Sequence, residues 1–171
     1  MYISEAFTYC PRCSAKFEKA AEEHLQCPQC GLSYYINPKP CTSLLLQNER
    51  GEYLLTQRAR APQKGLWDLP GGFVDEGETF EEGMRRETKE ELGIELGDLT
   101  YFGSFYDTYD YQGVIYPTLA VTFRAQLSEN ADLQPADDVA SFHFLALADV
   151  LLENLAFPSI RQTFERLTSK N

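Results

Sequence analysis

Residues 72–94 read GFVDEGETFEEGMRRETKEELGI and contain eight carboxylates but three basic side chains. Within them, the segment Glu78–Leu92 predicts a helix that follows a polar, glycine-containing loop. Thr79 and Glu82 have the spacing of a capping box at its start, and Gly93 can adopt the left-handed conformation that ends many helices. The stretch therefore indicates a loop that leads into an acidic helix.

Three carboxylates of this helix are expected on one face, because residues three and four positions apart lie side by side. They are Glu87, Glu90 and Glu91. Their repulsion opposes folding unless cations lie between them, and Mg²⁺ suits such a patch because it prefers oxygen ligands and bridges phosphate oxygens. Arg86 is one turn from Glu90 and can neutralise part of the patch. The competing interpretation is a solvated acidic face with salt bridges, the usual role of a run of charges.

The spacing of this stretch resembles the signature of the Nudix hydrolase family, GX5EX7REUXEEXGU, in which U is a bulky aliphatic residue. The matching positions are Gly72, Glu78, Arg86, Glu87, Glu90, Glu91, Gly93 and Ile94. Thr88 departs from the signature, and we expect it to pack beneath the helix without binding metal. The resemblance extends from about Pro40 to Leu152 and includes LLTQR at 54–58 and GLWDLPGG at 65–72.

This resemblance implies a Nudix-type α/β/α sandwich with a mixed sheet, and an enzyme that hydrolyses a diphosphate linkage in a nucleoside diphosphate derivative. The derivative would be a nucleotide sugar, a dinucleotide or a nucleoside triphosphate, and the cofactor Mg²⁺ or Mn²⁺. The implied metal ligands are Gly71 through its carbonyl, Glu87, Glu90 and Glu91. The alternative is a catalytically silent Nudix fold that senses a ligand or binds a partner.

The resemblance also assigns supporting roles. Glu87 is either a ligand or the general base, Arg86 orients it, and Glu78 supports the helix. A further carboxylate often comes from a loop beyond the sheet, and Asp138 is the candidate for this metal ligand, with Asp137 as the alternative. An ordinary acidic loop explains that pair equally well.

The remaining elements follow from periodicity and turn residues. Strands are expected at 41–46, 53–57, 99–107, 114–125 and 142–145, a short strand that runs into a loop at 67–72, and further helices at 147–153 and 159–167. The segment 109–113 predicts a hairpin between the two longest strands. Strands mixed with helices in this order indicate an α/β fold.

The cysteines Cys10, Cys13, Cys27 and Cys30 form two CxxC pairs with the spacing of a structural zinc site. We therefore expect a small four-cysteine zinc ribbon at residues 1–36, followed by a Nudix domain at 37–171; a redox role is the lesser interpretation. The glycine after the second pair, Gly31, is expected to have a positive φ.

A zinc ribbon before a Nudix domain resembles the NADH pyrophosphatase branch. That branch carries a Ser-Gln-Pro-Trp-Pro-Phe-Pro-type segment, which is absent from Tyr101–Pro117, and this counts against NADH as the substrate. Tyr109 and Tyr111 lie there instead. They could stack on a substrate base, although packing within the sheet is the commoner role of such tyrosines.

The net charge of the 171 residues is −11, which disfavours nucleic acid as a partner because phosphate backbones repel an acidic chain. Residues 1–40 add no basic face. No apolar run approaches the roughly 18 residues of a membrane span, and residues 1–10 lack the features of a signal peptide. We expect a cytoplasmic protein with a nucleotide-like small-molecule partner and no membrane contact; a homodimer is left open.

Overall fold

The computed structural model describes residues 1–21 and 24–169, and it divides into two compact units. The smaller unit comprises Met1–Lys39 together with Thr108–Thr118. The larger comprises Pro40–Asp107 and the chain from Leu119 onward. Residues 22–23 of the predicted ribbon and residues 170–171 of the predicted Nudix domain lie outside the described residues.

A six-stranded sheet forms the centre of the larger unit, with the order β6-β5-β4-β8-β7 and β9 paired with β5. Its strands are β4 (Lys39–Gln47), β5 (Tyr53–Arg58), β6 (Trp67–Asp68), β7 (Thr100–Tyr111), β8 (Val114–Gln126) and β9 (Val139–Leu145). β5 runs antiparallel to β4, β6 and β9. By contrast, Ser43 contacts Thr122 and Gln47 contacts Gln126, so β4 and β8 run in the same direction. The sheet is therefore mixed, as predicted.

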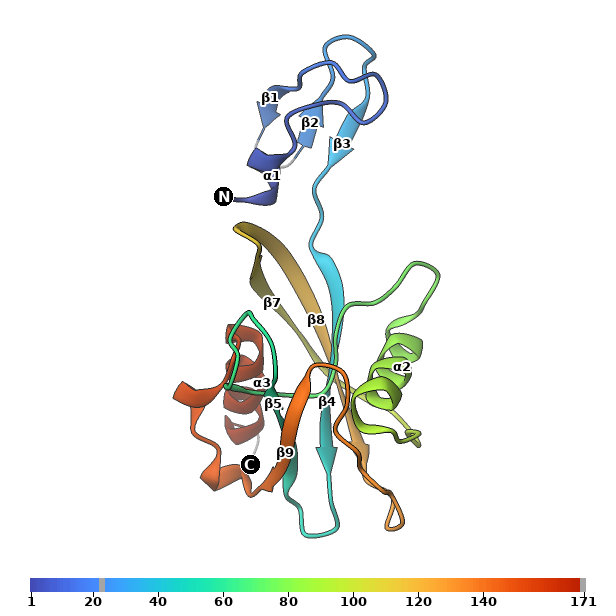
Figure 1. Ribbon diagram of the computed structural model, residues 1–171, viewed down its shortest axis with the longest axis vertical. Coiled ribbons are helices and arrows are strands. Elements are labelled where there is room, and N and C mark those ends of the chain that lie inside the picture. The colour runs from blue at the N-terminus through green and yellow to red at the C-terminus, as the bar shows by residue number, and fades with distance from the viewer. Residues whose placement is uncertain (22–23, 170–171) are drawn as a thin grey trace. The chain divides into compact units, whose positions relative to one another are not determined.

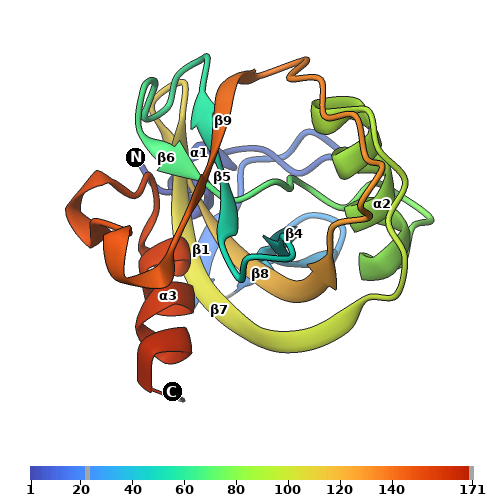
Figure 2. The ribbon, with the colours of Figure 1, turned by 90° about the horizontal axis from the view of Figure 1, so that it is seen from below.

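One helix packs on each face of this sheet, α2 (Phe80–Leu92) on one and α3 (Pro158–Ser169) on the other (Figures 1 and 2). Side chains alternate between the faces of a strand. In β4, Leu44 and Leu46 accordingly pack with Met84 of α2, whereas Leu45 packs with Phe164 of α3. All five side chains are fully buried. This arrangement confirms the predicted α/β sandwich.

The ends of α2 are fixed by the residues that the sequence indicates. Thr79 accepts a hydrogen bond from the backbone of Glu82, whose side chain accepts one from the backbone of Thr79. Gly93 ends the helix in the left-handed conformation, with φ of 74°. The helix begins at Phe80 rather than at Glu78 as expected, because Thr79 is extended and serves as the cap.

The segment 147–153 is not the helix that its composition predicts. It forms two short 3₁₀ turns, η1 (Leu147–Asp149) and η2 (Leu152–Asn154), separated by extended backbone at Val150 and Leu151. Leu147, Val150 and Leu152 pack against the core beneath α3, and a continuous helix could not turn all three toward it at this spacing. Among the described residues, no helix combines the length and hydropathy needed to cross a membrane.

The smaller unit contains α1 (Ile3–Ala6) and a three-stranded antiparallel sheet of β1 (Glu18–Ala21), β2 (His24–Gln26) and β3 (Ser33–Tyr35). Its core is formed by Cys10, Phe17, Leu25 and Cys27. The tip of the β7–β8 hairpin belongs to this unit as well.

That tip turns through two residues with positive φ, Gln112 at 52° and Gly113 at 78°, as expected of a tight hairpin. The Met1 ammonium donates a hydrogen bond to the Gly113 carbonyl, and the Met1 carbonyl accepts one from the Ile115 backbone, both at 2.8 Å.

Candidate active site and cysteine cluster

Glu91 is the most buried carboxylate of α2, with 6% of its surface exposed. Its Oε2 accepts a hydrogen bond from the Gly71 backbone N–H at 3.0 Å. Burial nevertheless raises the pKa of Glu91 well above its usual value, and the negative charges of Asp138, Glu87 and Asp68 raise it further. The fold thus places a carboxylate where its ionised form is disfavoured until positive charge is added.

The Gly71–Gly72 turn lets the backbone approach these carboxylates. A Cβ on Gly72 would lie 2.5 Å from Oε1 of Glu87, so a glycine there leaves room for that carboxylate. A Cβ on Gly71, which has φ of 141°, would lie 2.1 Å from the Thr42 carbonyl oxygen. The Thr42 N–H in turn donates to the Gly72 carbonyl, which ties the turn to β4.

Arg86 holds three carboxylates of the signature at once. Its guanidinium makes two hydrogen bonds to Glu78, at 2.8 and 3.0 Å, and donates to Glu87 at 2.9 Å and to Glu90 at 3.1 Å. The Arg86 hydrogen bonds lower the pKa of Glu78, with help from the Asp75 backbone. The pKa of Glu87 is raised by burial, which outweighs Arg86. Arg86 therefore lowers the pKa of Glu78 but does not offset the burial of Glu87.

Asp138 lies close enough to the helix for its charge to raise the pKa values of Glu87 and Glu91. Its position is fixed by its own carbonyl, which accepts a hydrogen bond from the Ala59 N–H at 2.7 Å, and by Arg58, 3.9 Å from its carboxylate. The structure thus brings Asp138 into the electrostatic field of the predicted carboxylates.

Asp137 has a different partner. Its carboxylate lies 3.5 Å from Arg60, and more than half of its side chain is exposed. The charges that raise the pKa values of Glu87 and Glu91 come from Asp138 and from other carboxylates of the patch. Of the two loop carboxylates, Asp138 is therefore the one associated with the helix.

Asp68 is a buried carboxylate that sequence reasoning missed. Burial raises its pKa to about 6, although Arg58 donates to it at 3.0 Å and lowers that pKa in part. An acidic residue between Trp67 and Leu69 in a predicted strand, with an arginine at the end of the preceding strand, was the available signal. Arg58 joins Asp68 to Asp138 and holds the loop against the sheet.

Tyr109 and Tyr111 belong to a different unit from these carboxylates. Both tyrosines belong to the smaller unit, where their rings stack with centroids 6.2 Å apart, whereas the carboxylates all belong to the larger unit. Their role in substrate binding stays a prediction.

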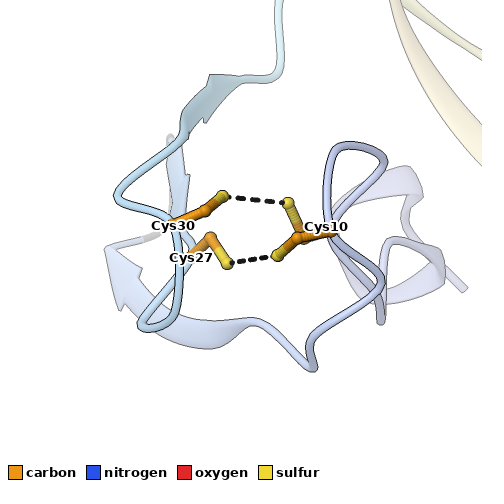
Figure 3. Close-up of side chains that lie close together, drawn as sticks. Cys10, Cys27 and Cys30 are labelled. Carbon is orange, nitrogen blue, oxygen red and sulfur yellow. Dashed lines mark hydrogen bonds between the residues drawn. The ribbon is translucent and has the colours of Figure 1, made fainter.

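The four cysteines meet as the spacing predicts. The sulfur atoms of Cys10, Cys13, Cys27 and Cys30 all lie within 4.8 Å of one another. The sulfur atoms of Cys10 and Cys30 lie 3.7 Å apart, and those of Cys13 and Cys27 lie 3.5 Å apart. Figure 3 shows Cys27 and Cys30 facing Cys10 across the cluster. Four thiols at such distances provide a tetrahedral set of soft ligands, as zinc requires.

The two CxxC turns have the same backbone geometry. Ser14 and Gly31, the residues after each pair, have φ of 61° and 72°, and each donates a hydrogen bond to the carbonyl of the first cysteine of its pair. Gly31 therefore has the positive φ that was expected. Hydrogen bonds from the backbone of Cys30 and Gln29 lower the pKa of Cys27 to about 6, which favours the thiolate that binds metal.

A mixed-sheet sandwich whose acidic helix follows a double-glycine turn has the architecture and residue pattern of a Nudix fold. The NUDIX domain family matches residues 37–167, and the chain belongs to this family. The resemblance drawn from the signature is thereby confirmed.

Relatives by sequence include NAD-capped RNA hydrolases NudC. The protein from Haemophilus influenzae (strain PittGG) is 39% identical over 100 residues, which cover 56% of this chain and 37% of that protein. The protein from Pseudomonas aeruginosa (strain LESB58) is 35% identical over 97 residues, covering 56% and 34%. The match thus spans about a third of these curated relatives.

Similar solved structures include a NUDIX hydrolase from Nitrosomonas europaea, with a TM-score of 0.71 and 25% identity over 96% of this chain and 92% of that one. The NUDIX domain of Shewanella oneidensis NrtR, complexed with ADP ribose, has a TM-score of 0.65 and 25% identity. It covers 80% of this chain and 90% of that one. These likenesses support the Nudix fold over the described chain.

Proposed function

We propose that this chain hydrolyses a diphosphate linkage in a nucleoside diphosphate derivative, using Mg²⁺ or Mn²⁺ held by the carboxylates of α2. The observation that carries the proposal is the deep burial of Glu91 close to other carboxylates. A buried carboxylate beside Glu87, Asp138 and Asp68 destabilises the fold when ionised, and an acidic group kept at that disadvantage marks a functional site.

The donor set fits a divalent cation. Hydrolases of this family use divalent metals. Glu90, Glu91 and Asp138 would supply carboxylate oxygens and Gly71 a backbone carbonyl, with Glu87 as a further ligand where it does not act as the base, and such hard oxygen ligands suit Mg²⁺ or Mn²⁺. Held there, the ion would neutralise diphosphate oxygens and make a bound water more acidic.

The side chains around the patch orient the reacting groups. Arg86 holds Glu87 from one side, and the missing side chain of Gly72 keeps the other side open. Burial makes the Glu87 carboxylate a better proton acceptor because it raises its pKa. We assign Glu87 as the group that accepts the proton of the attacking water, and Glu78 as the anchor of Arg86. Arg58 positions Asp138.

The substrate class follows from the relatives by analogy. Those named as NAD-capped RNA hydrolases act on a dinucleotide at an RNA end, and one similar Nudix domain is complexed with ADP ribose. We infer that the substrate carries an adenosine-type diphosphate. The test includes this diphosphate both alone and attached to RNA, because an acidic chain is expected to disfavour long phosphate backbones.

The cysteine cluster is assigned to one structural zinc in a ribbon at residues 1–36, ahead of a Nudix domain at 37–171. Four sulfur ligands leave no open position for chemistry. Reduced thiols that hold zinc are typical of the cytoplasm, which is the location we propose.

The test is hydrolysis of a panel containing ADP-ribose, NAD⁺, NADH, a diadenosine polyphosphate, ATP and NAD-capped RNA. Phosphorus NMR in ¹⁸O-water identifies the phosphomonoesters and the phosphorus that is attacked. We expect hydrolysis to require Mg²⁺ or Mn²⁺ and to be lost in Glu90→Gln. Tight binding of ADP-ribose with no turnover would instead establish the silent ligand sensor.

A further inference from the structure

The smaller unit contains a cavity that no part of the proposed active site uses. It has a volume of about 320 Å³ and lies where α1, the segment after β3 and the start of β8 meet. Its lining includes Phe7, Tyr34, Tyr35, Asn37, Lys39 and Tyr116. All of the lining residues belong to the smaller unit. A cavity near 300 Å³ is at the lower end of the range for small-molecule sites.

This cavity depends on contacts between distant parts of the chain. Phe7 and Tyr34 stack with ring centroids 5.0 Å apart, which joins the N-terminal segment to the ribbon sheet. Both pack against the cysteine core. The hydrogen bonds between Met1 and the hairpin bring the start of β8 to the same place. The cavity therefore has walls that the folding of the ribbon fixes.

The chemistry of the lining is aromatic and cationic. Four of the named residues carry rings, and 63% of the Tyr35 surface is exposed. The Lys39 ammonium lies 5.1 Å from the centre of the Tyr116 ring. Asn37 adds an exposed amide that can both donate and accept hydrogen bonds.

A nucleotide matches these features one by one. Its base stacks on aromatic rings, and this contact is available to any base because each has a π-face. An amide can pair with the polar edge of a base. A lysine binds phosphate as a point charge. A purely apolar ligand would make no polar contact with Lys39 or Asn37, and a free phosphate would not use the rings.

We propose that this cavity binds a nucleoside monophosphate unit, with the base against the tyrosine rings and the phosphate at Lys39. The ribbon then serves as a second nucleotide site in addition to its zinc. The proposal does not depend on hydrolysis by the Nudix domain, so either one can fail without the other.

The experiment is calorimetric titration of zinc-loaded protein carrying Glu90→Gln, in buffer without divalent ions, so that the proposed active site contributes least. AMP, adenosine and ribose 5-phosphate are the three ligands. We expect saturable binding of AMP, at least about tenfold tighter than binding of either fragment, because each fragment lacks one of the two contacts.

Two variants locate the site. Lys39→Ala should weaken AMP binding about tenfold while leaving adenosine unchanged, since a charged hydrogen bond to phosphate is lost. Tyr116→Leu should weaken AMP and adenosine roughly tenfold alike, because a stacking contact is lost. Lys16→Ala and Tyr9→Leu, exposed residues of the same unit outside the lining, are the matched controls.

Zinc content and the proton NMR spectrum verify that each variant is folded. AMP binding that is absent up to millimolar concentration overturns the proposal. So does binding that is unchanged in Lys39→Ala, or that falls equally in the Lys16→Ala control.

Discussion

The cysteine cluster and the carboxylates of α2 are both crowded groups of ionisable side chains, but their charges are stabilised in different ways. Backbone N–H groups donate to the cysteine sulfurs and lower the pKa of Cys27 to about 6, whereas burial and the neighbouring thiols raise the pKa of Cys13 to about 12. Around the carboxylates, Arg86 lowers the pKa of Glu78, while Glu87 and Glu91 keep raised pKa values. One cluster is prepared for a permanent ion, and the other is left short of positive charge.

This difference agrees with the roles proposed for the two clusters, structural for the cysteines and reactive for the carboxylates. Four identical ligands from two matching turns can surround an ion completely. The α2 carboxylates come from one helix face and are unequally buried, with Glu91 at 6% exposure and Glu90 largely open to solvent. A patch of that kind leaves sides of an ion free for substrate oxygens. Substitutions in each cluster can test this contrast.

The largest effect is expected from Cys27→Ser. Structural zinc contributes about 10–16 kcal/mol in small zinc-binding peptides, so loss of one ligand should release the ion and unfold the ribbon. Elemental analysis should fall from one zinc per chain to none. Cys41→Ser, outside the cluster, is the control and should keep its zinc. A wild-type protein that contains neither zinc nor iron and has its thiols in disulfides would refute the assignment.

Next in size is the loss of turnover in Glu90→Gln or Glu91→Gln. Each should lower kcat by more than the roughly 10–100-fold that an outer partner of a metal ligand contributes. Without metal, Glu91→Gln should melt at a higher temperature than wild type at pH 7, because the penalty for ionising a buried carboxylate is removed.

Glu81→Gln is the control for these variants, since Glu81 is an exposed carboxylate of the same helix. If the control loses as much activity as the other two, the assignment of the metal ligands is wrong.

Arg58→Lys should have an intermediate effect. Lysine keeps the charge but cannot reach Asp68, Asp138 and the Pro62 carbonyl together, as the Arg58 guanidinium does. We expect metal affinity, measured by Mn²⁺ titration, to fall roughly 10-fold. Arg60→Lys affects only the exposed ion pair with Asp137 and should leave the metal affinity unchanged. Equal losses in both variants would contradict the preference for Asp138.

The pH dependence of stability should be modest and should depend on metal. Asp68 has a pKa of about 6 in the folded protein, against roughly 3.9 in an unfolded chain. Between these values the folded state binds more protons, so the free energy of unfolding decreases as the pH rises from about 4 to 6. The pKa values of Glu87 and Glu91 are also raised in the folded protein, so these residues contribute in the same direction.

Chemical unfolding at several pH values measures this trend. Mg²⁺ should reverse this decrease in the free energy of unfolding, because the ion binds the deprotonated carboxylates. Because the lowered pKa of Glu78 acts in the opposite direction, the contribution of Asp68 is measured as the difference in unfolding free energy between the wild type and Asp68→Asn. A metal-free difference that rises from pH 4 to 6 would contradict the raised pKa of Asp68.

Thr88→Val should have the smallest effect. Thr88 is fully buried, and its hydroxyl donates to the Met84 carbonyl within α2. Loss of that hydrogen bond and gain of a methyl group nearly cancel, within about 1 kcal/mol. Thermal melting and kcat should both stay near wild type. A large loss of activity would show that Thr88 affects the patch and not packing alone.

Local signals were enough to predict α2 and most strands. The cap at Thr79, the stop at Gly93 and the CxxC turns are each set by residues a few positions apart, and each has the predicted geometry. Extended stretches with alternating side chains also lie within a few residues of their expected bounds.

What could not be predicted depends on contacts between distant residues. Nothing near Asp68 in the sequence indicates how deeply it is buried, because Arg58 and Asp138 reach it only after folding. The joining of the hairpin tip to the ribbon depends on bonds between Met1 and residues more than 100 positions away. The segment 147–153 does not form the predicted helix, because its apolar side chains pack against the core.

The double-glycine turn has a consequence for how this sequence can change over evolutionary time. A side chain at position 72 would collide with the carboxylate of Glu87, the group assigned here to accept a proton. A side chain at position 71 would collide with the backbone carbonyl of Thr42. Among relatives that keep an acid at position 87, we therefore expect glycine to persist at both positions, at 72 to leave room for a reactive side chain and at 71 to leave room for the backbone.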